Sequence, residues 1–156
     1  MTKKITMEMY LQGRDTAYPM DYEPYKTNAR QIVDTMNKFL ADHLGYIIIS
    51  SGFRPARLNN SIAGAAKKSN HIKCLAIDIK DLAPFPLMKY VLKNLELASE
   101  LGIYFEDFRA TPSWVHCQIV PPGSGRRIFK PNSSDWLSPN KWSGDYEDKY
   151  NNEPNS

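Results

Sequence analysis

The chain has 156 residues, a hydrophobic fraction of 42% and a formal net charge of +3 at pH 7. This length suits one domain with one core, and no apolar run approaches the roughly 20 residues that would span a bilayer. The positive charge is small and spread along the chain, so neither a nucleic-acid partner nor a membrane partner is expected. The opening segment MTKKITMEMYLQGRD has no apolar core and no small-residue cleavage site. It therefore predicts no secretory signal peptide.

The first helix is predicted to follow an irregular beginning. The first thirty residues are polar and aromatic, and AYPM and YEPY mark turns, so we expect an irregular N-terminal arm packed on the domain. From Asn28, apolar residues recur at spacings of three and four as far as Leu44, which predicts an amphipathic helix. Asn28 is the expected N-cap and Gly45 the expected stop. His43, near the end of this helix, is interpreted as a solvated histidine beside the helix dipole.

Four short segments rich in β-branched or aromatic residues predict strands. They are YIIIS (46–50), CLAIDIKD (74–81), IYFEDF (103–108) and WVHCQIV (114–120). The long connection after the first of them, rich in Gly, Ser, Asn and Pro, is typical of a functional loop.

The order of the predicted elements favours an α+β fold. FPLMKYVLKNLELASELG (85–102) predicts a second amphipathic helix, with Pro86 in its first turn and Gly102 just past its end. We expect one domain over residues 1–130, with two main helices packed on an antiparallel sheet. Residues 131–156 are expected to form a polar, partly disordered tail.

Two of the three histidines and one aspartate are candidate metal ligands. His71 ends the loop before the second predicted strand, His116 lies inside the last one, and Asp78 lies within an apolar run. A carboxylate in such a run is costly to bury unless something compensates its charge. Strand alternation places Asp78 with Cys74 and Ala76, away from the apolar face. Two imidazoles, one carboxylate and one position left to water form a set that a catalytic zinc would use.

The two cysteines are not predicted to bind metal. Cys74 and Cys117 are expected to be reduced, buried thiols. Alternation turns Cys117 away from the face of His116. Cys74 would lie roughly 13 Å from Asp78 along a continuous strand, at about 3.3 Å per residue.

Three segments in order resemble a known family. They are SGFRP (51–55), SNHIKCLAID (69–78) and WVHCQI (114–119). They resemble the serine-glycine-aromatic-arginine turn, the SxHxxGxAxD segment and the late aromatic-x-His strand of the zinc D-alanyl-D-alanine carboxypeptidase and murein peptidase family, which includes small phage and bacterial members. The resemblance implies the fold shared with hedgehog signalling domains, and Zn²⁺ bound by His71, Asp78 and His116. It also implies that Arg54 reaches into the active site and that Ser69 orders the loop before the first ligand, both beside the substrate. Cys74 stands where the family has glycine.

The sequence also departs from the family pattern at the position expected for the catalytic base. Many relatives carry an acidic residue or histidine two or three positions before the last ligand, where this chain has Trp114 and Ser113. If the last two predicted strands form a hairpin, Glu106 or Asp107 lies beside the metal. Alternation places these two on opposite faces and does not choose between them. A Y-x-E resemblance to small phage-type relatives favours Glu106, with Asp107 as the alternative.

The resemblance implies a zinc metallopeptidase that hydrolyses peptide bonds in peptidoglycan stem peptides. Its type would be a D-Ala-D-Ala carboxypeptidase or an L-alanyl-D-glutamate endopeptidase. Arg54 would stabilise the oxyanion or hold a substrate carboxylate, unless it is a salt-bridge partner that orders its loop. Trp114 would pack against a substrate methyl group or sugar, unless it is a core or rim aromatic. Arg126 and Arg127 are interpreted as a solvated pair or as contacts to anionic stem peptides.

An alternative function is a catalytically inactive, zinc-containing domain that binds the cell wall. The missing acid just before His116 is the feature that favours it. In either case we expect a monomer that is synthesised in the cytoplasm and acts on the cell wall, after phage-type release or as part of a virion.

Overall fold

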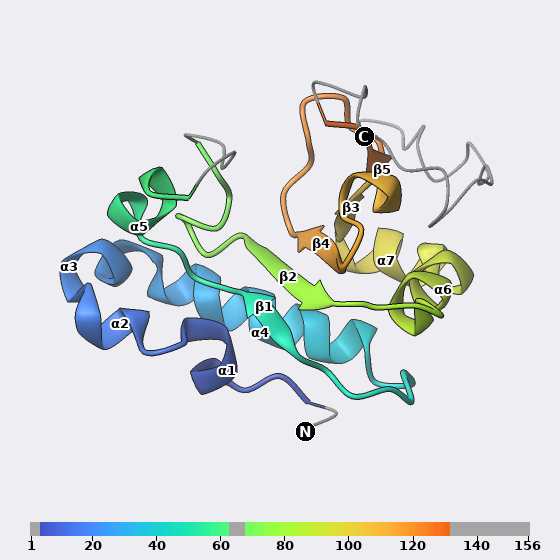
Figure 1. Cartoon of the computed structure of the whole chain (residues 1–156), viewed down its shortest axis with the longest axis horizontal. Coiled ribbons are helices and arrows are strands. Elements are labelled where there is room, and N and C mark those ends of the chain that lie inside the picture. Colours follow the sequence, from blue (N-terminus) through green and yellow to red (C-terminus); the bar gives the residue numbers. More distant parts are fainter. Residues whose placement is uncertain (1–3, 63–67, 132–156) are drawn as a thin grey trace. The chain divides into compact units, whose positions relative to one another are not determined.

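The computed structural model describes residues 4–62 and 68–131 (Figure 1). Five strands form one sheet in the order β1-β2-β4-β3-β5. β3 and β4 are antiparallel, whereas β3 and β5 are parallel. The predicted α+β class with a mainly antiparallel sheet is therefore confirmed. The predicted tail lies, apart from its first residue, outside the described residues.

The chain divides into two compact units, Met1–Asp78 and Ile79–Ser156, and strand β2 runs through the boundary. The described elements of the first unit are α1 (Met7–Leu11), α2 (Arg14–Ala17), α3 (Pro19–Tyr22), η1 (Glu23–Tyr25), α4 (Lys26–Phe39), β1 (Ile49–Ser51), α5 (Ala56–Asn60) and the start of β2 (Ala76–Lys80). Those of the second are the end of β2, α6 (Pro86–Lys93), α7 (Leu95–Leu101), β3 (Tyr104–Glu106), η2 (Phe108–Ala110), β4 (Trp114–Gln118) and β5 (Ile128–Phe129).

Helix α4 contributes the largest apolar stripe of the first unit, as its periodicity predicts. Its termini differ from the prediction, because it begins at Lys26 and ends at Phe39. Asn28 is therefore not the N-cap, and its side chain instead donates to the carbonyl oxygen of Lys73 at 3.1 Å. His43 lies beyond the helix end and is only 8% exposed, so its interpretation as a solvated histidine is wrong.

The prediction of an irregular N-terminal arm is also wrong, since the arm consists of short helices. The Thr6 hydroxyl caps α1 by accepting from the backbone N–H of Met9 at 3.1 Å. One turn on, the buried Tyr10 hydroxyl donates to the carbonyl oxygen of Ala76 at 3.0 Å. Helix α1 is thereby fixed to the start of β2, the strand that carries Asp78.

In the second unit, the single helix predicted over 85–102 is two helices. Asn94 separates α6 from α7, and its side chain donates to the carbonyl oxygen of Tyr90 at 2.7 Å. Pro86 opens α6 and Gly102 ends α7 in a left-handed conformation, both as predicted. The carboxylate of Asp81 caps α6 through bonds of 3.0 Å from the backbone N–H groups of Leu87 and Met88.

Buried polar groups in the second unit include an arginine that we interpreted as solvated or substrate-facing. Arg127 is 1% exposed, donates to the carbonyl oxygen of Ile103 at 2.9 Å and lies 4.1 Å from the ring centroid of Tyr104.

Cys74 and Cys117 are buried and form no disulfide, as predicted. Within the described residues, no helix combines the length and apolarity needed to cross a membrane.

Candidate metal centre

His71 is held in a turn before β2 by bonds to its backbone and its ring. Its N–H donates to the hydroxyl of Ser69 at 3.2 Å, and the role of Ser69 beside the substrate stays a prediction. Its Nδ1 lies 2.9 Å from the carbonyl oxygen of Gly52. Because a carbonyl oxygen can only accept, Nδ1 carries the proton, and the neutral ring has its lone pair on Nε2.

The carboxylate of Asp78 faces that lone pair. Its Oδ2 lies 3.2 Å from Nε2 of His71, and the Asp78 side chain is 12% exposed. Two acceptors at this distance repel each other unless a proton or a metal cation lies between them. Metal-binding imidazoles commonly donate one ring N–H to a backbone carbonyl and offer the other nitrogen to the metal, so the ring orientation of His71 is compatible with a metal at Nε2.

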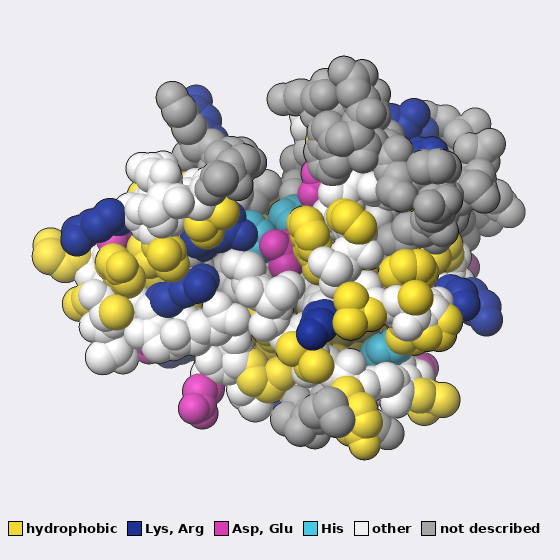
Figure 2. Space-filling model, viewed as in Figure 1, with side chains coloured by type: hydrophobic (Ala, Val, Ile, Leu, Met, Phe, Trp, Pro, Cys, Tyr) yellow, Lys and Arg dark blue, Asp and Glu magenta, His cyan; other side chains and the backbone are white. Residues whose placement is uncertain are grey.

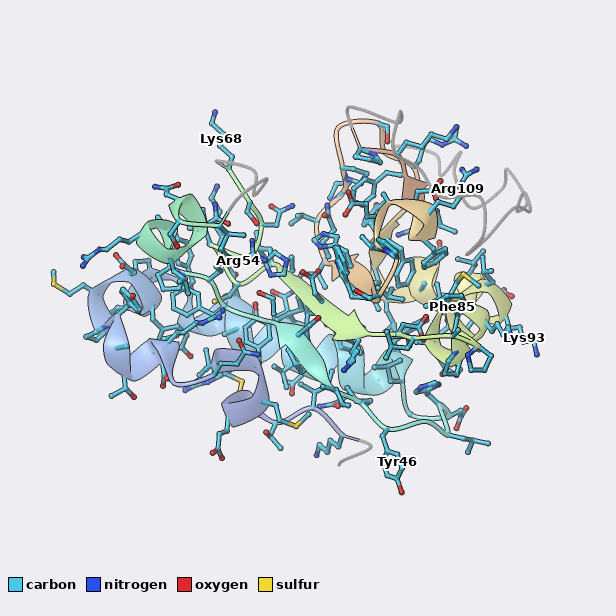
Figure 3. All side chains as sticks on the ribbon, viewed as in Figure 1. Tyr46, Arg54, Lys68, Phe85, Lys93 and Arg109 are labelled. Atoms are coloured by element: carbon cyan, nitrogen blue, oxygen red, sulfur yellow. The ribbon has the colours of Figure 1, made fainter. Side chains whose placement is uncertain are left out.

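Arg54, in the segment between β1 and α5 (Figure 3), lies beside this pair. Its Nη2 is 3.7 Å from Oδ2 of Asp78. The guanidinium also donates to Asn59 Oδ1 at 3.0 Å and to Ser51 Oγ at 3.1 Å. Burial lowers the pKa of Arg54, and the charge of Asp78 opposes that shift. These contacts match the loop-ordering alternative, and contact with substrate stays a prediction.

Gly52 is required in the SGFRP segment because two backbones approach closely there. A Cβ at this position would lie 1.9 Å from the carbonyl oxygen of Tyr10. Gly52→Ala should therefore lower the free energy of unfolding by about 3 kcal/mol, because the backbone that carries the His71 bond must shift. Urea denaturation measures this loss. Gly123→Ala is the matched control, since nothing lies within 4 Å of its added Cβ; an equal loss in both variants would contradict the close approach.

His116 lies on β4 in the second unit, and its ring is also oriented by a hydrogen bond. Its Nε2 is 2.9 Å from Oε1 of Gln118. The amide nitrogen of Gln118 donates to the carbonyl oxygen of Val120 at 2.8 Å, so Oε1 is the acceptor and His116 Nε2 is the donor. The lone pair of the neutral ring is therefore on Nδ1.

His71 and Asp78 in the first unit and His116 on β4 of the second are the described residues that could, as a group, hold a metal ion. Histidine and acidic side chains are visible on the face drawn in the space-filling view (Figure 2). Imidazole nitrogen and carboxylate oxygen are ligands that zinc accepts.

The register of β3 on β4 shows which acid shares the face of His116. Tyr104 pairs with Gln118 and Phe105 with Cys117, so the next pair in this antiparallel register is Glu106 with His116. Directly opposite residues share a face, with Cβ atoms roughly 4.5–5.5 Å apart. Glu106 is therefore the cross-strand neighbour of His116.

Asp107, the alternative base, is used in local structure. It is buried, and its Oδ1 accepts from the backbone N–H and Nε of Arg109 at 3.0 and 2.9 Å. Its Oδ2 pairs with Nη2 of the same arginine, labelled in Figure 3, at 2.7 Å. This carboxylate caps η2, and the assignment of the base stays a prediction.

A family model described as Peptidase M15 matches residues 3–118, most of the chain. The chain belongs to the peptidase M15 family. The family resemblance of the three sequence segments is thus confirmed. No curated protein and no solved structure matches the chain. The matched segment of this M15 peptidase contains all three candidate ligands and Glu106, and it ends at Gln118.

Phe129 and Gln118 lie beside the candidate base and ligand of this M15 peptidase. The sequence analysis did not suggest either residue. Phe129 pairs with Glu106 in the parallel register of β3 and β5, and its ring centroid lies 6.2 Å from that of His116, edge-on. Gln118 orients His116. β5 has only two residues and carries no detectable periodicity, whereas Gln118 is visible in the sequence as the alternate residue after His116. Trp114, half-buried, shares that face by alternation.

In this M15 peptidase, Cys74 stands where the family has glycine, and its backbone conformation shows why glycine suits this position. It has φ +57°, a left-handed conformation that favours glycine, and it precedes β2, which begins only at Ala76. Burial raises the pKa of its thiol to about 12, although a hydrogen bond with Tyr10 lowers it. The thiol of the metal-free chain therefore stays protonated at neutral pH.

Proposed function

We propose that this M15 peptidase is a zinc-dependent hydrolase of peptide bonds in peptidoglycan stem peptides. The observation that carries the proposal is the 3.2 Å contact between His71 Nε2 and Asp78 Oδ2. Since Gly52 fixes the proton on the other ring nitrogen, two acceptors face each other, and both side chains are mostly buried. A divalent cation removes their repulsion, and a set of two imidazoles and one carboxylate suits zinc with one position open.

In this proposal, His71 Nε2, an oxygen of Asp78 and His116 Nδ1 would hold the zinc. When bound, zinc supplies Lewis-acid polarisation of the scissile carbonyl and lowers the pKa of water in the site. Arg54 keeps the carboxylate of Asp78 in place through its own bonds to Ser51 and Asn59.

Glu106 would act as the general base. From its position opposite His116, its carboxylate would take a proton from the attacking water and deliver it to the leaving amine. Phe129 on β5 and Trp114 on β4 would offer apolar surface for the methyl groups of alanyl residues. In this proposal the neighbouring strand would supply the acid that relatives carry just before the last ligand, which would favour an enzyme over an inactive binding domain.

Digestion of purified murein, with and without a chelator, tests this function. We expect mass spectrometry to find released D-alanine, or peptides cut between L-alanine and D-glutamate, with the zinc-loaded protein. The chelator should remove this activity, and added zinc should restore it. A zinc-loaded protein that binds murein but releases no product would instead support the binding domain.

A further inference from the structure

Gln118 is held at both ends of its side-chain amide. It is 4% exposed, its Nε2 donates to the carbonyl oxygen of Val120 at 2.8 Å, and its Oε1 accepts from His116 Nε2 at 2.9 Å. The bond to Val120 fixes which end of the amide is the donor. The oxygen is thereby presented to the imidazole, and the ring must offer it a proton.

We propose that Gln118 is a positioning residue for His116, which keeps the proton on Nε2 and aims the lone pair of Nδ1 at the metal. The role as a ligand orienter rests on the proposed function, whereas the ring orientation is a property of the metal-free chain. Hydrogen-bond partners of this kind set both the tautomer and the orientation of a metal-binding imidazole, and their loss typically weakens metal binding by about 10- to 100-fold.

The surroundings of Gln118 make it suitable for this role. It pairs with Tyr104 across the β3–β4 register, and the buried guanidinium of Arg127 lies over the Tyr104 ring. On the other side of the bond, the Phe129 ring lies edge-on to the His116 ring, with the centroids 6.2 Å apart. The hydrogen bond therefore joins two side chains that are each held by packing.

Two substitutions separate the positioning role from a role in strand structure. Gln118→Glu keeps an acceptor for His116 but removes the donor to Val120, whereas Gln118→Leu removes both. We expect zinc affinity, measured by competition with a chromophoric chelator, to fall about 10- to 100-fold in Gln118→Leu. Gln118→Glu should bind zinc at least as tightly as wild type, since a carboxylate is the stronger acceptor. Gln31→Leu, an exposed position on α4, is the control and should change nothing.

Nitrogen-15 NMR of the metal-free protein gives a readout that does not depend on activity. The His116 Nε2–H signal should be protected from exchange in wild type and in Gln118→Glu, and lost in Gln118→Leu. Equal weakening of zinc binding in both variants, or a wild-type signal that exchanges as fast as that of Gln118→Leu, would overturn the proposal. If wild type shows the protected signal but neither binds zinc nor cleaves murein, the proposed function fails and the hydrogen-bonding role of Gln118 stands.

Discussion

Replacing Glu106 with glutamine should lower the rate of peptide-bond hydrolysis by about 10²- to 10⁴-fold. Glutamine keeps the size of the side chain and its place opposite His116, but it cannot accept the proton of the attacking water. Zinc content and thermal midpoint should stay at wild-type values, because no predicted ligand is altered. Hydrolysis of a purified stem peptide, followed chromatographically, gives the rate, and elemental analysis gives the zinc content.

Asp107→Asn is the matched control, because it makes the same chemical change in the adjacent residue. It removes the charge from a buried carboxylate that Arg109 contacts at both oxygens, so the free energy of unfolding should fall by roughly 1–3 kcal/mol. Its rate per folded molecule should remain near that of wild type. The reverse pattern, a slow Asp107→Asn and a fast Glu106→Gln, would assign the base to Asp107.

The choice between these two acids shows where reasoning from sequence ends. Alternation correctly separates Glu106 and Asp107 into opposite faces, because it depends only on the strand itself. Which face meets His116 depends on the register of two strands separated by η2 and its flanking turn. A shift of one residue would exchange the two acids, and only the pairing of Tyr104 with Gln118 excludes it.

The elements that the sequence missed are short. Helices α1 to α3 have four or five residues each, too few for a 3.6-residue period to repeat. The break at Asn94 is equally hidden, since apolar residues recur on both sides of it and its side chain bonds back to the preceding turn. The longer patterns of α4, β2 and β4 are correctly predicted in type, with errors only at their ends.

The candidate ligands were accessible from sequence because the chain has few histidines and an aspartate within an apolar run. The sequence could not show which ring nitrogen of His71 carries the proton. That depends on the carbonyl of Gly52, which is distant in the chain and lies beside His71 in a segment where the backbone N–H of Arg54 also donates to the carbonyl oxygen of His71. The acceptor–acceptor contact with Asp78 follows from this bond.

The contact between His71 Nε2 and Asp78 Oδ2 predicts that zinc stabilises the fold. It also predicts that Asp78→Asn abolishes this stabilisation. At a free zinc concentration about 100 times the Kd, binding should add about 2.7 kcal/mol, or roughly 5–10 °C in thermal midpoint. In Asp78→Asn the amide can donate to His71 Nε2, so the repulsion is gone without metal. This new bond offsets the lost ion pair with Arg54, and the metal-free variant should keep about the wild-type midpoint. Differential scanning calorimetry with zinc and with a chelator measures both quantities.

Asp81→Asn provides the control, because Asp81 is also buried and its carboxylate accepts from backbone N–H groups of α6. It should lower the midpoint with and without zinc by the same amount and keep the full zinc-dependent increase. If Asp78→Asn still gained stability from zinc as wild type does, the cation would have to bind elsewhere. If wild type gained none, the Asp78–His71 pair would have to be held by a proton on the ring, and the zinc-dependent mechanism would fail with it.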